Sequence, residues 1–466
     1  MNAVAATSGK GSAMEVSSNA YIGGKEARLL ASLDQSKFTG KHWWLYAALT
    51  LTHLTDGFDL LMIGVVLPGI VATFKLTPTE AGLLGSSAFV GMALGAVTIT
   101  YLADQFGRKK ALLLCVFLYG ILSLAAALAW DYYSILITRL IQGVGIGAEM
   151  PLVLTYLMEF VPVRRRGVSS AATISLWQLA GLFAALAAIV IVPAFTWRGM
   201  FVLGAVPVLL MLIVLFMIPE SIRYLVHRNR LEEAEQIVKR FSSVDSATVG
   251  VEPKPTPARI ELGDILRGKY LRCTLGAWIM SVAWSMAFFG MSVWLPSLLM
   301  RSGFTLVHSF AYTAAITGAG AAGVFMSGIF MDWLGRRTAM TLGFFLGGLS
   351  MIAWGLSTTP TLILTFGLLT AFVGTGGVAG CLFTYICEIY PTEFRATGAG
   401  FSIAWQRIGG IIAPTALGLL VGTQSSAFGS FVLLGGLLIV GAIVAITLTY
   451  ETGGKTLEQI TMSLAA

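Results

Sequence analysis

Long apolar runs separated by short polar loops dominate the chain from residue 43 onward. The runs lack the period-two alternation of barrel strands, and at about 20 residues or more each can cross roughly 30 Å of hydrocarbon as a helix. We therefore predict an all-α integral membrane fold with twelve transmembrane helices. The predicted spans are 43–72, 81–103, 111–130, 134–160, 169–193, 197–218, 271–299, 308–331, 338–357, 361–389, 398–422 and 427–449.

Polar stretches divide these runs into segments. Residues 1–42 are polar, rich in small residues and without a cleavable-signal pattern, which predicts a cytoplasmic tail. The sequence 230–240 is amphipathic, and a Ser/Pro/Val-rich stretch follows it. The predicted organisation is an N-terminal cytoplasmic tail (1–42), an N-terminal six-helix bundle (43–218), a cytoplasmic linker with one amphipathic helix (219–270), a C-terminal six-helix bundle (271–449) and a C-terminal cytoplasmic tail (450–466).

Composition and charge support a membrane location. Of the 466 residues, 56% are hydrophobic and only 11% are charged, against about 25% charged in soluble domains. The net charge of +7 does not indicate nucleic-acid binding, because Lys and Arg cluster in alternate short loops. Examples are 108–110, 164–166 and 336–337. This asymmetry predicts a multi-pass protein of the cytoplasmic (inner) membrane with both termini in the cytoplasm, and we expect a monomer.

The sequence offers no sign of catalytic chemistry. Cys115, Cys273, Cys381 and Cys387 fall in apolar stretches without metal-ligand spacing, which predicts neither a metal site nor a disulfide framework. No Ser/His/Asp or His-rich arrangement occurs at membrane depth. We expect no enzymatic activity and no cofactor, with a proton gradient as the driving force.

The two halves of the chain repeat each other. Asp-x-x-Gly-Arg at Asp104 recurs at Asp332, Thr-Tyr-x-x-Glu recurs around Glu159 and Glu388, and Trp-Gln recurs at positions 177 and 405, each at an offset of 228 or 229. Three matches at one offset of nearly half the chain predict two pseudo-symmetric six-helix bundles. A binding site is then expected near the midplane between them.

Two aspartates lie inside the first span. Asp56 and Asp59 are three residues apart on one predicted helix, with His53 one turn earlier. An ionisable group in the middle of a membrane helix costs roughly 2.5–3.5 kcal/mol, so such groups generally mark a substrate or ion pathway. We predict that Asp56, Asp59 and His53 couple transport to protons. The alternative is that one aspartate caps a helix near the interface.

Further charged residues lie within apolar spans. Arg407 has about ten apolar residues on either side, and a buried guanidinium requires an anion, such as an aspartate or a ligand carboxylate. Arg139 either does the same or lies near the interface with its charge in water. Aromatic and amide side chains near Arg407 and in the equivalent span suit a flat organic ligand. The predicted binding residues are Arg407, Trp405, Gln406, Trp177, Gln178, Glu149, Tyr156, Tyr385 and Phe288.

These motifs resemble those of a known family. The Asp-x-x-Gly-Arg-Lys loop at Asp104 resembles the cytoplasmic loop of the major facilitator superfamily, and the resemblance extends over residues 43–457. The sequences 139–147, 219–225 and 451–458 resemble patterns of sugar porters and organic-ion transporters. Within that branch, Asp56-Gly-Phe-Asp59 resembles the signature of the aromatic acid:proton symporters. The resemblance implies the major facilitator fold and inward transport of benzoate-like carboxylates.

A charged latch is predicted at the cytoplasmic ends of the helices. Asp104 stands just before span three, where it can accept hydrogen bonds from free helix N–H groups. Arg108 can pair with Glu159 or Glu220. The predicted latch consists of Asp104, Arg108, Glu159, Arg166, Glu220, Asp332, Arg336, Glu388 and Arg395.

The sequence therefore predicts a proton-coupled importer of a small organic anion of the aromatic carboxylate class that works by alternating access in the lipid bilayer. A proton-coupled exporter of organic cations is the main alternative, since Asp56, Asp59 and Glu149 could bind a cation. A sugar porter is a further alternative, but span seven lacks the glutamines and asparagine with which sugar porters bind hydroxyl groups. A membrane sensor remains a minor alternative.

Overall fold

The structure is a computed structural model that describes residues 28–207, 217–242, 244, 268–390, 395–423, 428–455, 459, 460 and 463. All regular elements of this part of the chain are helices. In the N-terminal half they are α2 (Gly40–Phe74), α3 (Pro78–Phe106), α4 (Arg108–Ala127), α5 (Tyr132–Phe160), α6 (Val163–Trp177) and α7 (Leu179–Gly204). Two shorter helices, α9 (Ile222–His227) and α10 (Leu231–Phe241), precede the C-terminal half. That half contains α11 (Gly268–Arg301), α12 (Leu306–Leu334), α13 (Arg336–Leu356), α14 (Pro360–Leu369), the π-helical segment η1 (Thr370–Gly377), α15 (Val378–Ile389), α16 (Arg395–Thr423) and α17 (Phe428–Leu448).

Eleven helical stretches of the described residues are long and apolar enough to cross a membrane. Each overlaps at least one predicted span, and the outer faces carry exposed apolar side chains such as Val97 and Ile329. Exposed apolar side chains on every outer helix are what a lipid environment requires, because lipid solvates them and water does not. The all-helical membrane architecture is confirmed.

A backbone break separates the fifth and sixth predicted spans. Thr196 inside α7 has φ 59° and ψ −173°, which no helix accommodates, and Pro193 precedes it by three residues. Positive φ is strained for a β-branched residue, so Thr196 forms the turn between two helices rather than part of one. Residues 208–216 of the predicted span 197–218 lie outside the described residues.

Glycines let equivalent helices approach closely in both halves. A Cβ atom on Gly147 of α5 would collide with the carbonyl oxygen of Met92 on α3. The corresponding contact in the second half joins Gly376 of η1 to the carbonyl oxygen of Gly320 on α12. These two contacts are related by the repeat offset seen in the sequence. Only glycine allows this backbone-to-backbone approach in a membrane bundle.

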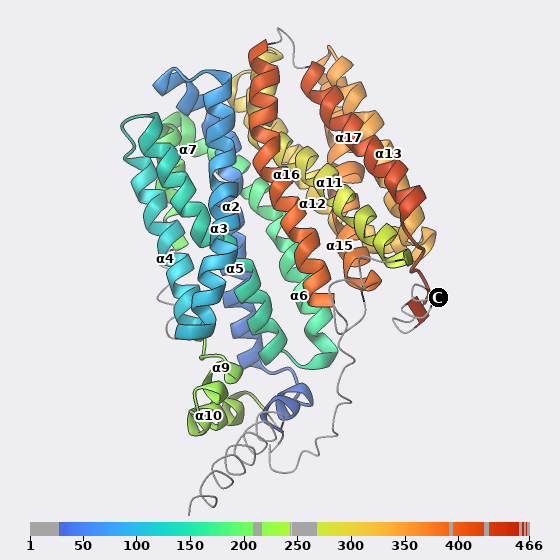
Figure 1. The fold of residues 1–466 in the computed structure, drawn as a ribbon. Coiled ribbons are helices and arrows are strands. Elements are labelled where there is room, and N and C mark those ends of the chain that lie inside the picture. The colour runs from blue at the N-terminus through green and yellow to red at the C-terminus, as the bar shows by residue number, and fades with distance from the viewer. Residues whose placement is uncertain are drawn as a thin grey trace, which may run out of the picture.

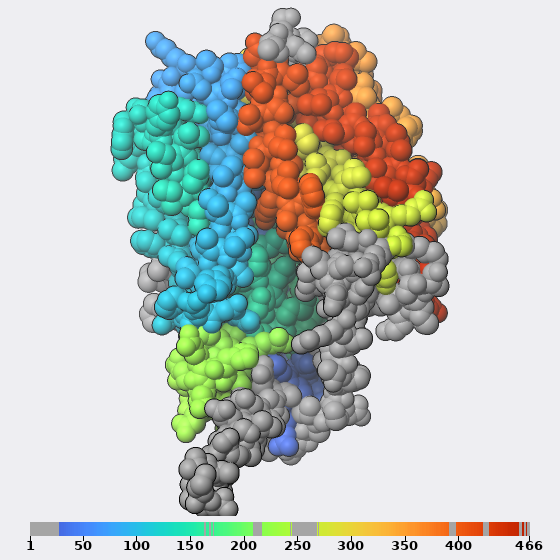
Figure 2. Space-filling view, in the orientation of Figure 1, coloured from blue at the N-terminus to red at the C-terminus, as the bar shows by residue number. Residues whose placement is uncertain are grey.

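The short helices α9 and α10 mark one end of the molecule, here called the linker end (Figure 1). They lie against the N-terminal half, as the space-filling view shows (Figure 2). The amphipathic helix α10 buries Ala234, Val238 and Phe241 in a cluster with Leu45 and Phe160. The predicted amphipathic helix is confirmed, and its apolar face packs on protein.

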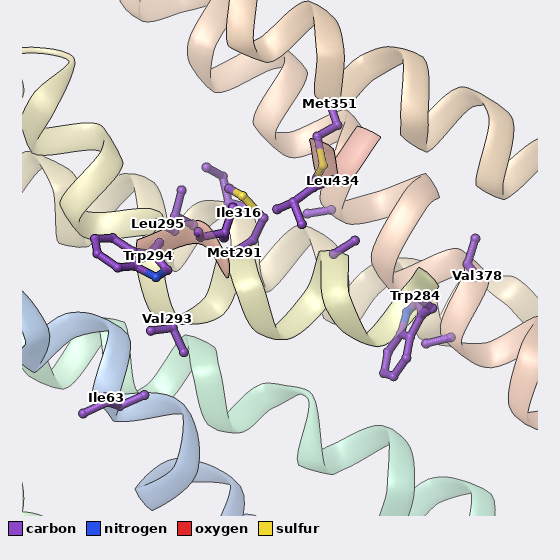
Figure 3. Packing of buried hydrophobic residues seen from close by; sticks show 14 of the residues in the cluster. Ile63, Trp284, Met291, Val293, Trp294, Leu295, Ile316, Met351, Val378 and Leu434 are labelled. Carbon is purple, nitrogen blue, oxygen red and sulfur yellow. The ribbon is translucent and has the colours of Figure 1, made fainter. Parts of the chain in front are cut away.

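The two halves pack together at the opposite end, here called the far end. The hydroxyl of Ser86 on α3 donates to the carbonyl oxygen of Ile411 on α16 (2.6 Å). A Cβ on Gly64 of α2 would collide with the carbonyl oxygen of Ser292 on α11. Nearby, Ile63 and Val293 meet between α2 and α11 (Figure 3). The close packing at this end places the remaining space between the halves nearer the middle of the molecule.

Candidate functional site

A cavity of about 60 Å³ lies between the two halves near the middle of the helices. We call it the charged cavity, because it is lined by His53, Asp56 and Arg407. Six predicted site residues lie on its wall, namely His53, Asp56, Trp177, Gln178, Gln406 and Arg407. The sequence therefore identified residues from both halves that the fold brings to one place.

His53 forms the centre of a buried cluster. Its Nδ1 atom lies 2.9 Å from Oε2 of Glu149 on α5 and 3.5 Å from Oδ2 of Asp56 on its own helix. The second oxygen of Asp56 accepts a hydrogen bond from Nε1 of Trp177 (2.8 Å). Oε1 of Glu149 is buried without a hydrogen-bond partner among the described residues. The cluster thus joins α2, α5 and α6 and holds two carboxylates beside one imidazole.

This cluster has the donor atoms of a metal site, because one nitrogen and two carboxylate oxygens lie within 4.8 Å of one another. The contacts just described already use most of these atoms for hydrogen bonds within the protein. The arrangement therefore suits the binding and release of protons. A carboxylate of the cluster that takes up a proton changes from acceptor to donor in its hydrogen bond, and it changes back when the proton leaves.

Asp59 belongs to a separate network one turn further along α2. Nη1 of Arg139 lies 3.4 Å from Oδ2 of Asp59 and donates to its main-chain carbonyl oxygen (3.0 Å). Ser123 donates to Oδ1 of Asp59 (3.0 Å), and Gln142 accepts from Arg139 (2.8 Å). Arg139 is fully buried, so the alternative of a charge held at the interface is wrong. Asp59 does not line the charged cavity, in contrast to the expectation of one shared polar face.

Arg407 forms no ion pair with a described residue, although Asp56 lines the same cavity. No carboxylate oxygen of a described residue lies within 4.0 Å of its guanidinium, and its one recorded contact is with the sulfur of Met92 (3.7 Å). The amide nitrogen of the neighbouring Gln406 is buried and also lacks an acceptor in the described part of the chain. The wall formed by α16 therefore offers unsatisfied donors to the cavity.

Aromatic rings surround these polar groups. Trp284 stacks on Phe288 (centroids 5.2 Å apart, planes inclined by 7°), and Trp177 lies 6.3 Å from Phe288. The indole of Trp284 is oriented by a hydrogen bond to the carbonyl oxygen of Thr375 (2.7 Å). The sequence had indicated Trp177 and Phe288 but not Phe383, which also lines the cavity. A phenylalanine within a long, uniformly apolar span gives no sequence signal for such a position.

Three predicted binding residues do not reach the charged cavity. Trp405 instead packs on Trp278 of α11 (5.5 Å), because it points to another face of α16 than Arg407. Tyr156 is buried beside Phe160 in the cluster near the linker end. Tyr385 accepts a hydrogen bond from the main-chain N–H of Tyr450 (3.1 Å). Trp405 therefore does not join Trp177 on the wall of the charged cavity.

Two further predicted residues border the charged cavity. Glu149 lies behind His53, to which it is bonded. Phe288 lines a second cavity of about 60 Å³ on the far-end side, where it meets Gln178 of the charged cavity wall. Gln178 thus lies at the boundary of both cavities.

At the linker end, the N-terminal half carries a polar network around Arg108. Arg108 pairs with Glu159, whose other oxygen accepts a hydrogen bond from the Ser221 hydroxyl (2.7 Å). Glu220 accepts from the main-chain N–H groups of Lys109 (3.1 Å) and Ser221 (2.9 Å). Arg108 and the segment before α9 thereby hold α4, α5 and the start of the linker together.

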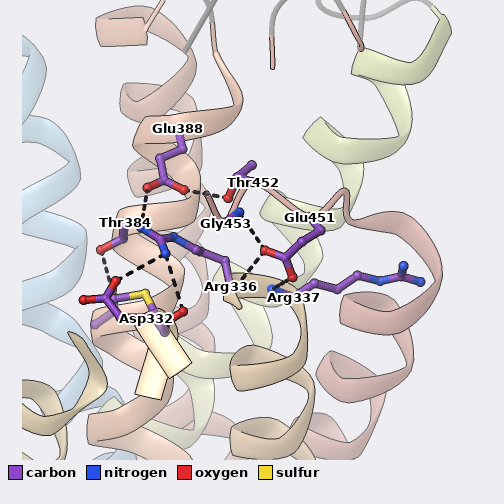
Figure 4. A network of polar contacts seen from close by, with 10 residues as sticks. Asp332, Arg336, Arg337, Thr384, Glu388, Glu451, Thr452 and Gly453 are labelled. Carbon is purple, nitrogen blue, oxygen red and sulfur yellow. Dashed lines mark hydrogen bonds and ion pairs between the residues drawn. The ribbon is translucent and has the colours of Figure 1, made fainter. Parts of the chain in front are cut away.

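The C-terminal half repeats this network (Figure 4). Arg336 lies 3.4 Å from Glu388, which also accepts a hydrogen bond from the Thr452 hydroxyl (2.6 Å). Glu451 accepts from the main-chain N–H groups of Arg336 (2.9 Å) and Arg337 (3.0 Å). Glu451 and Thr452 thus take the places of Glu220 and Ser221.

The predicted role of Asp104 is wrong. Both Asp104 and its repeat Asp332 are exposed. The main-chain N–H groups at the starts of α4 and α13 donate to Glu220 and Glu451 instead. Asp332 approaches only Arg336, at 3.4 Å. Arg166 pairs with Asp34 and lies outside the Arg108 network. The side chain of Arg395 lies outside the described part of the chain.

Comparison with known proteins gives one consistent family. The model of the Major Facilitator Superfamily matches residues 49–414. The chain is 32% identical to the niacin transporter NiaP of Acinetobacter baylyi, over 90% of this chain and 96% of that protein. It is 26% identical to the benzoate transport protein of the same organism, over 88% and 90% respectively. A solved structure of the xylose transporter XylE from E. coli shares the fold, with a TM-score of 0.73, 19% identity, and coverage of 90% of this chain and 100% of that one.

Proposed function

The chain belongs to the major facilitator superfamily of membrane transporters, and we propose that it imports a small organic anion together with protons. An aromatic carboxylate is the substrate class that fits the charged cavity best. The fold expected from the sequence is that of this family, and transport by alternating access follows from two similar halves with a site between them.

The observation that carries this proposal is the unpaired guanidinium of Arg407 inside the membrane. Because no carboxylate of a described residue pairs with this guanidinium, its N–H donors remain free for an anion in the loaded state. A carboxylate can take two parallel hydrogen bonds from a guanidinium, and the free amide nitrogen of Gln406 adds a third donor. The rings of Trp177, Trp284 and Phe288 offer flat apolar surface to an aromatic ligand.

The charges around the cavity support coupling to protons. Asp56 and Glu149 can carry two negative charges, which Arg407 and a protonated His53 balance. A bound carboxylate adds one negative charge that nothing in the cavity compensates. Uptake of one proton by the His53 cluster with each anion keeps the site neutral, which avoids the cost of a net charge in the bilayer. We therefore propose one proton per monovalent anion.

The names of the similar proteins support the same class of substrate. Niacin and benzoate are both small aromatic carboxylates, and the chain covers nearly the full length of the transporters named for them. Neither similarity determines which carboxylate this chain prefers.

We propose further that the linker end faces the cytoplasm of a cell whose inner membrane contains the protein. The basic residues of the Arg108 and Arg336 networks lie at this end, as the preference of Lys and Arg for cytoplasmic loops requires. Both termini then lie in the cytoplasm, with bundles 43–218 and 271–449 on either side of the linker. Labelling of an Arg240→Cys variant, with exposed Cys387 changed to Ser, should succeed only from the cytoplasm. Labelling from outside intact cells would overturn this orientation.

The test of function is uptake into proteoliposomes with an imposed pH gradient, acid outside. Benzoate and nicotinate should accumulate, and dissipation of the gradient by a protonophore should abolish accumulation. Tetraphenylphosphonium and xylose serve as the cation and sugar comparisons. Transport of the phosphonium cation in exchange for protons, without benzoate or nicotinate uptake, would overturn the anion assignment and favour the exporter.

A further inference from the structure

The second cavity has a different chemical character from the charged cavity. It is lined by four hydroxyl side chains, and we call it the hydroxyl cavity; its hydroxyl residues are Ser292, Thr313, Thr317 and Thr375. These come from α11, α12 and η1 of the C-terminal half, while Leu61, Val65 and Gly181 of the N-terminal half form the apolar opposite wall. No acidic or basic side chain of the described residues lines it.

All four hydroxyl groups already donate their hydrogen to a carbonyl oxygen one turn earlier. Thr313 donates to Ser309 (2.7 Å), Thr317 donates to Thr313 (2.8 Å) and Ser292 donates to Phe288 (2.7 Å). The fourth, Thr375, donates to Ala371 (3.2 Å). A hydroxyl group has one hydrogen and two lone pairs. While these bonds are kept, the hydroxyl oxygens remain available to the cavity as acceptors only.

Gln178 lies between the two cavities. It lines both, and no hydrogen bond of its side chain to a described residue is recorded. Along α2, the lining changes from Asp56 in the charged cavity to Leu61 in the hydroxyl cavity. Five residues of helix correspond to about 7.5 Å, so the two cavities are neighbours on the scale of one aromatic ring with its substituents. Trp284 lines the charged cavity, and Phe288, which stacks on it, lines the hydroxyl cavity.

The π-helical segment contributes to the same arrangement. Thr375 and Gly376 of η1 line the hydroxyl cavity, and the carbonyl oxygen of Thr375 accepts the indole N–H of Trp284. A π-helical turn widens the helix and shifts its carbonyl groups, which is why such turns are frequent at functional sites. Here it carries the Thr375 hydroxyl, which lines the hydroxyl cavity, and it orients the ring of Trp284, which lines the charged cavity.

We propose that the hydroxyl cavity is a subsite for a hydrogen-bond donor on the ligand, located at the end opposite the carboxylate. An aromatic acid with a ring hydroxyl or ring amino group has this chemistry, with its carboxylate on Arg407 and its donor directed past Phe288 to Gln178 and Thr317. The proposal rests on the proposed anion transport, and it defines which aromatic acids bind most tightly.

The test measures equilibrium binding to the purified full-length protein by titration calorimetry. The ligands are benzoate, 4-hydroxybenzoate, 4-aminobenzoate and 4-methoxybenzoate. The hydroxy and amino acids should bind about fivefold more tightly than benzoate, which corresponds to one net hydrogen bond. The methoxy acid has a similar size but no hydrogen-bond donor, so its affinity should equal that of benzoate. Thr317→Val removes an acceptor at constant shape and should bring the affinity ratio of 4-hydroxybenzoate to benzoate close to one.

Thr341→Val is the matched control. Thr341 on α13 also donates to a carbonyl oxygen one turn earlier (2.8 Å, to Arg337) but lines neither cavity. In the Thr341→Val variant, the affinity ratio of 4-hydroxybenzoate to benzoate should equal that of the wild type. Equal binding of all four ligands, or a ratio that survives in Thr317→Val, would overturn the subsite while the anion assignment stands. Absence of binding by every carboxylate would overturn the proposed function and the subsite with it.

Discussion

His53 on α2 and Glu149 on α5 lie 2.9 Å apart (Nδ1 to Oε2), although 96 positions separate them in the chain. Because Asp56 lies 3.5 Å from the same imidazole, a proton added at any of the three groups changes the hydrogen bonds of the other two. The helix that carries Asp56 and the helix that carries Glu149 are therefore joined by a contact whose strength depends on protonation. Proton binding can therefore change how α2 and α5 pack against each other in the N-terminal half.

The first prediction concerns three buried carboxylates, namely Asp56 and Glu149 of this cluster and Asp59 of the neighbouring Arg139 network. In Asp56→Asn, Asp59→Asn and Glu149→Gln, gradient-driven accumulation of benzoate in proteoliposomes should be lost, because a carboxylate that binds and releases the proton is removed. Exchange of internal for external benzoate should persist in part, since it needs no net proton movement. Asp104→Asn removes an exposed carboxylate and should accumulate benzoate as the wild type does. Full accumulation in the three variants would remove these residues from coupling.

The second prediction concerns how the buried pair Asp59–Arg139 contributes to the stability of the fold. In Arg139→Met, Asp59 keeps a charge without a partner, which costs about 3–5 kcal/mol. The double variant Asp59→Leu/Arg139→Met contains neither charge and should recover most of the lost stability. Thermal unfolding of the purified proteins in detergent gives the comparison. A double variant as unstable as Arg139→Met would show that the hydrogen bonds to Ser123 and Gln142 matter more than charge balance.

The third prediction concerns the charge of the ligand. Arg407→Lys keeps the cation but loses the planar pair of donors, so the dissociation constant for the carboxylate should rise about tenfold, or roughly 1.4 kcal/mol. Arg407→Gln should abolish measurable binding of the anion while the protein remains folded. Calorimetry with benzoate gives both values, and unchanged affinity in Arg407→Gln would contradict the anion site.

The fourth prediction compares helix caps with exposed carboxylates at the linker end. Glu451 accepts two main-chain N–H groups at the start of α13, so Glu451→Ala should lower the free energy of unfolding by about 1–2 kcal/mol. Glu220→Ala should act similarly at α4. Asp332→Ala changes an exposed residue and should stay within about 0.5 kcal/mol of the wild type. Equal effects at Glu451 and Asp332 in thermal unfolding would contradict the assignment of the caps.

The sequence by itself determined the helical membrane architecture. An apolar run of this length in a bilayer must satisfy its backbone hydrogen bonds internally, which leaves the helix as the solution. The offset shared by the Asp-x-x-Gly-Arg and Thr-Tyr-x-x-Glu motifs determined the repeat, and the cost of buried charge singled out Asp56, Asp59 and Arg407. Six residues of the charged cavity wall were found from these ionisable groups and from the repeated Trp-Gln pair, because ionisable and amide groups are rare at this depth.

Only the tertiary structure decided which of these groups meet. Helices that are apolar on every side carry little sequence signal for the direction each face takes. Packing therefore turned Trp405 toward Trp278, joined Arg139 to Asp59 and placed Glu149 beside His53. The caps of α4 and α13 were decided in the same way, because Glu220 and Glu451 are far from those helix starts in the chain and reach them only when the bundle is assembled.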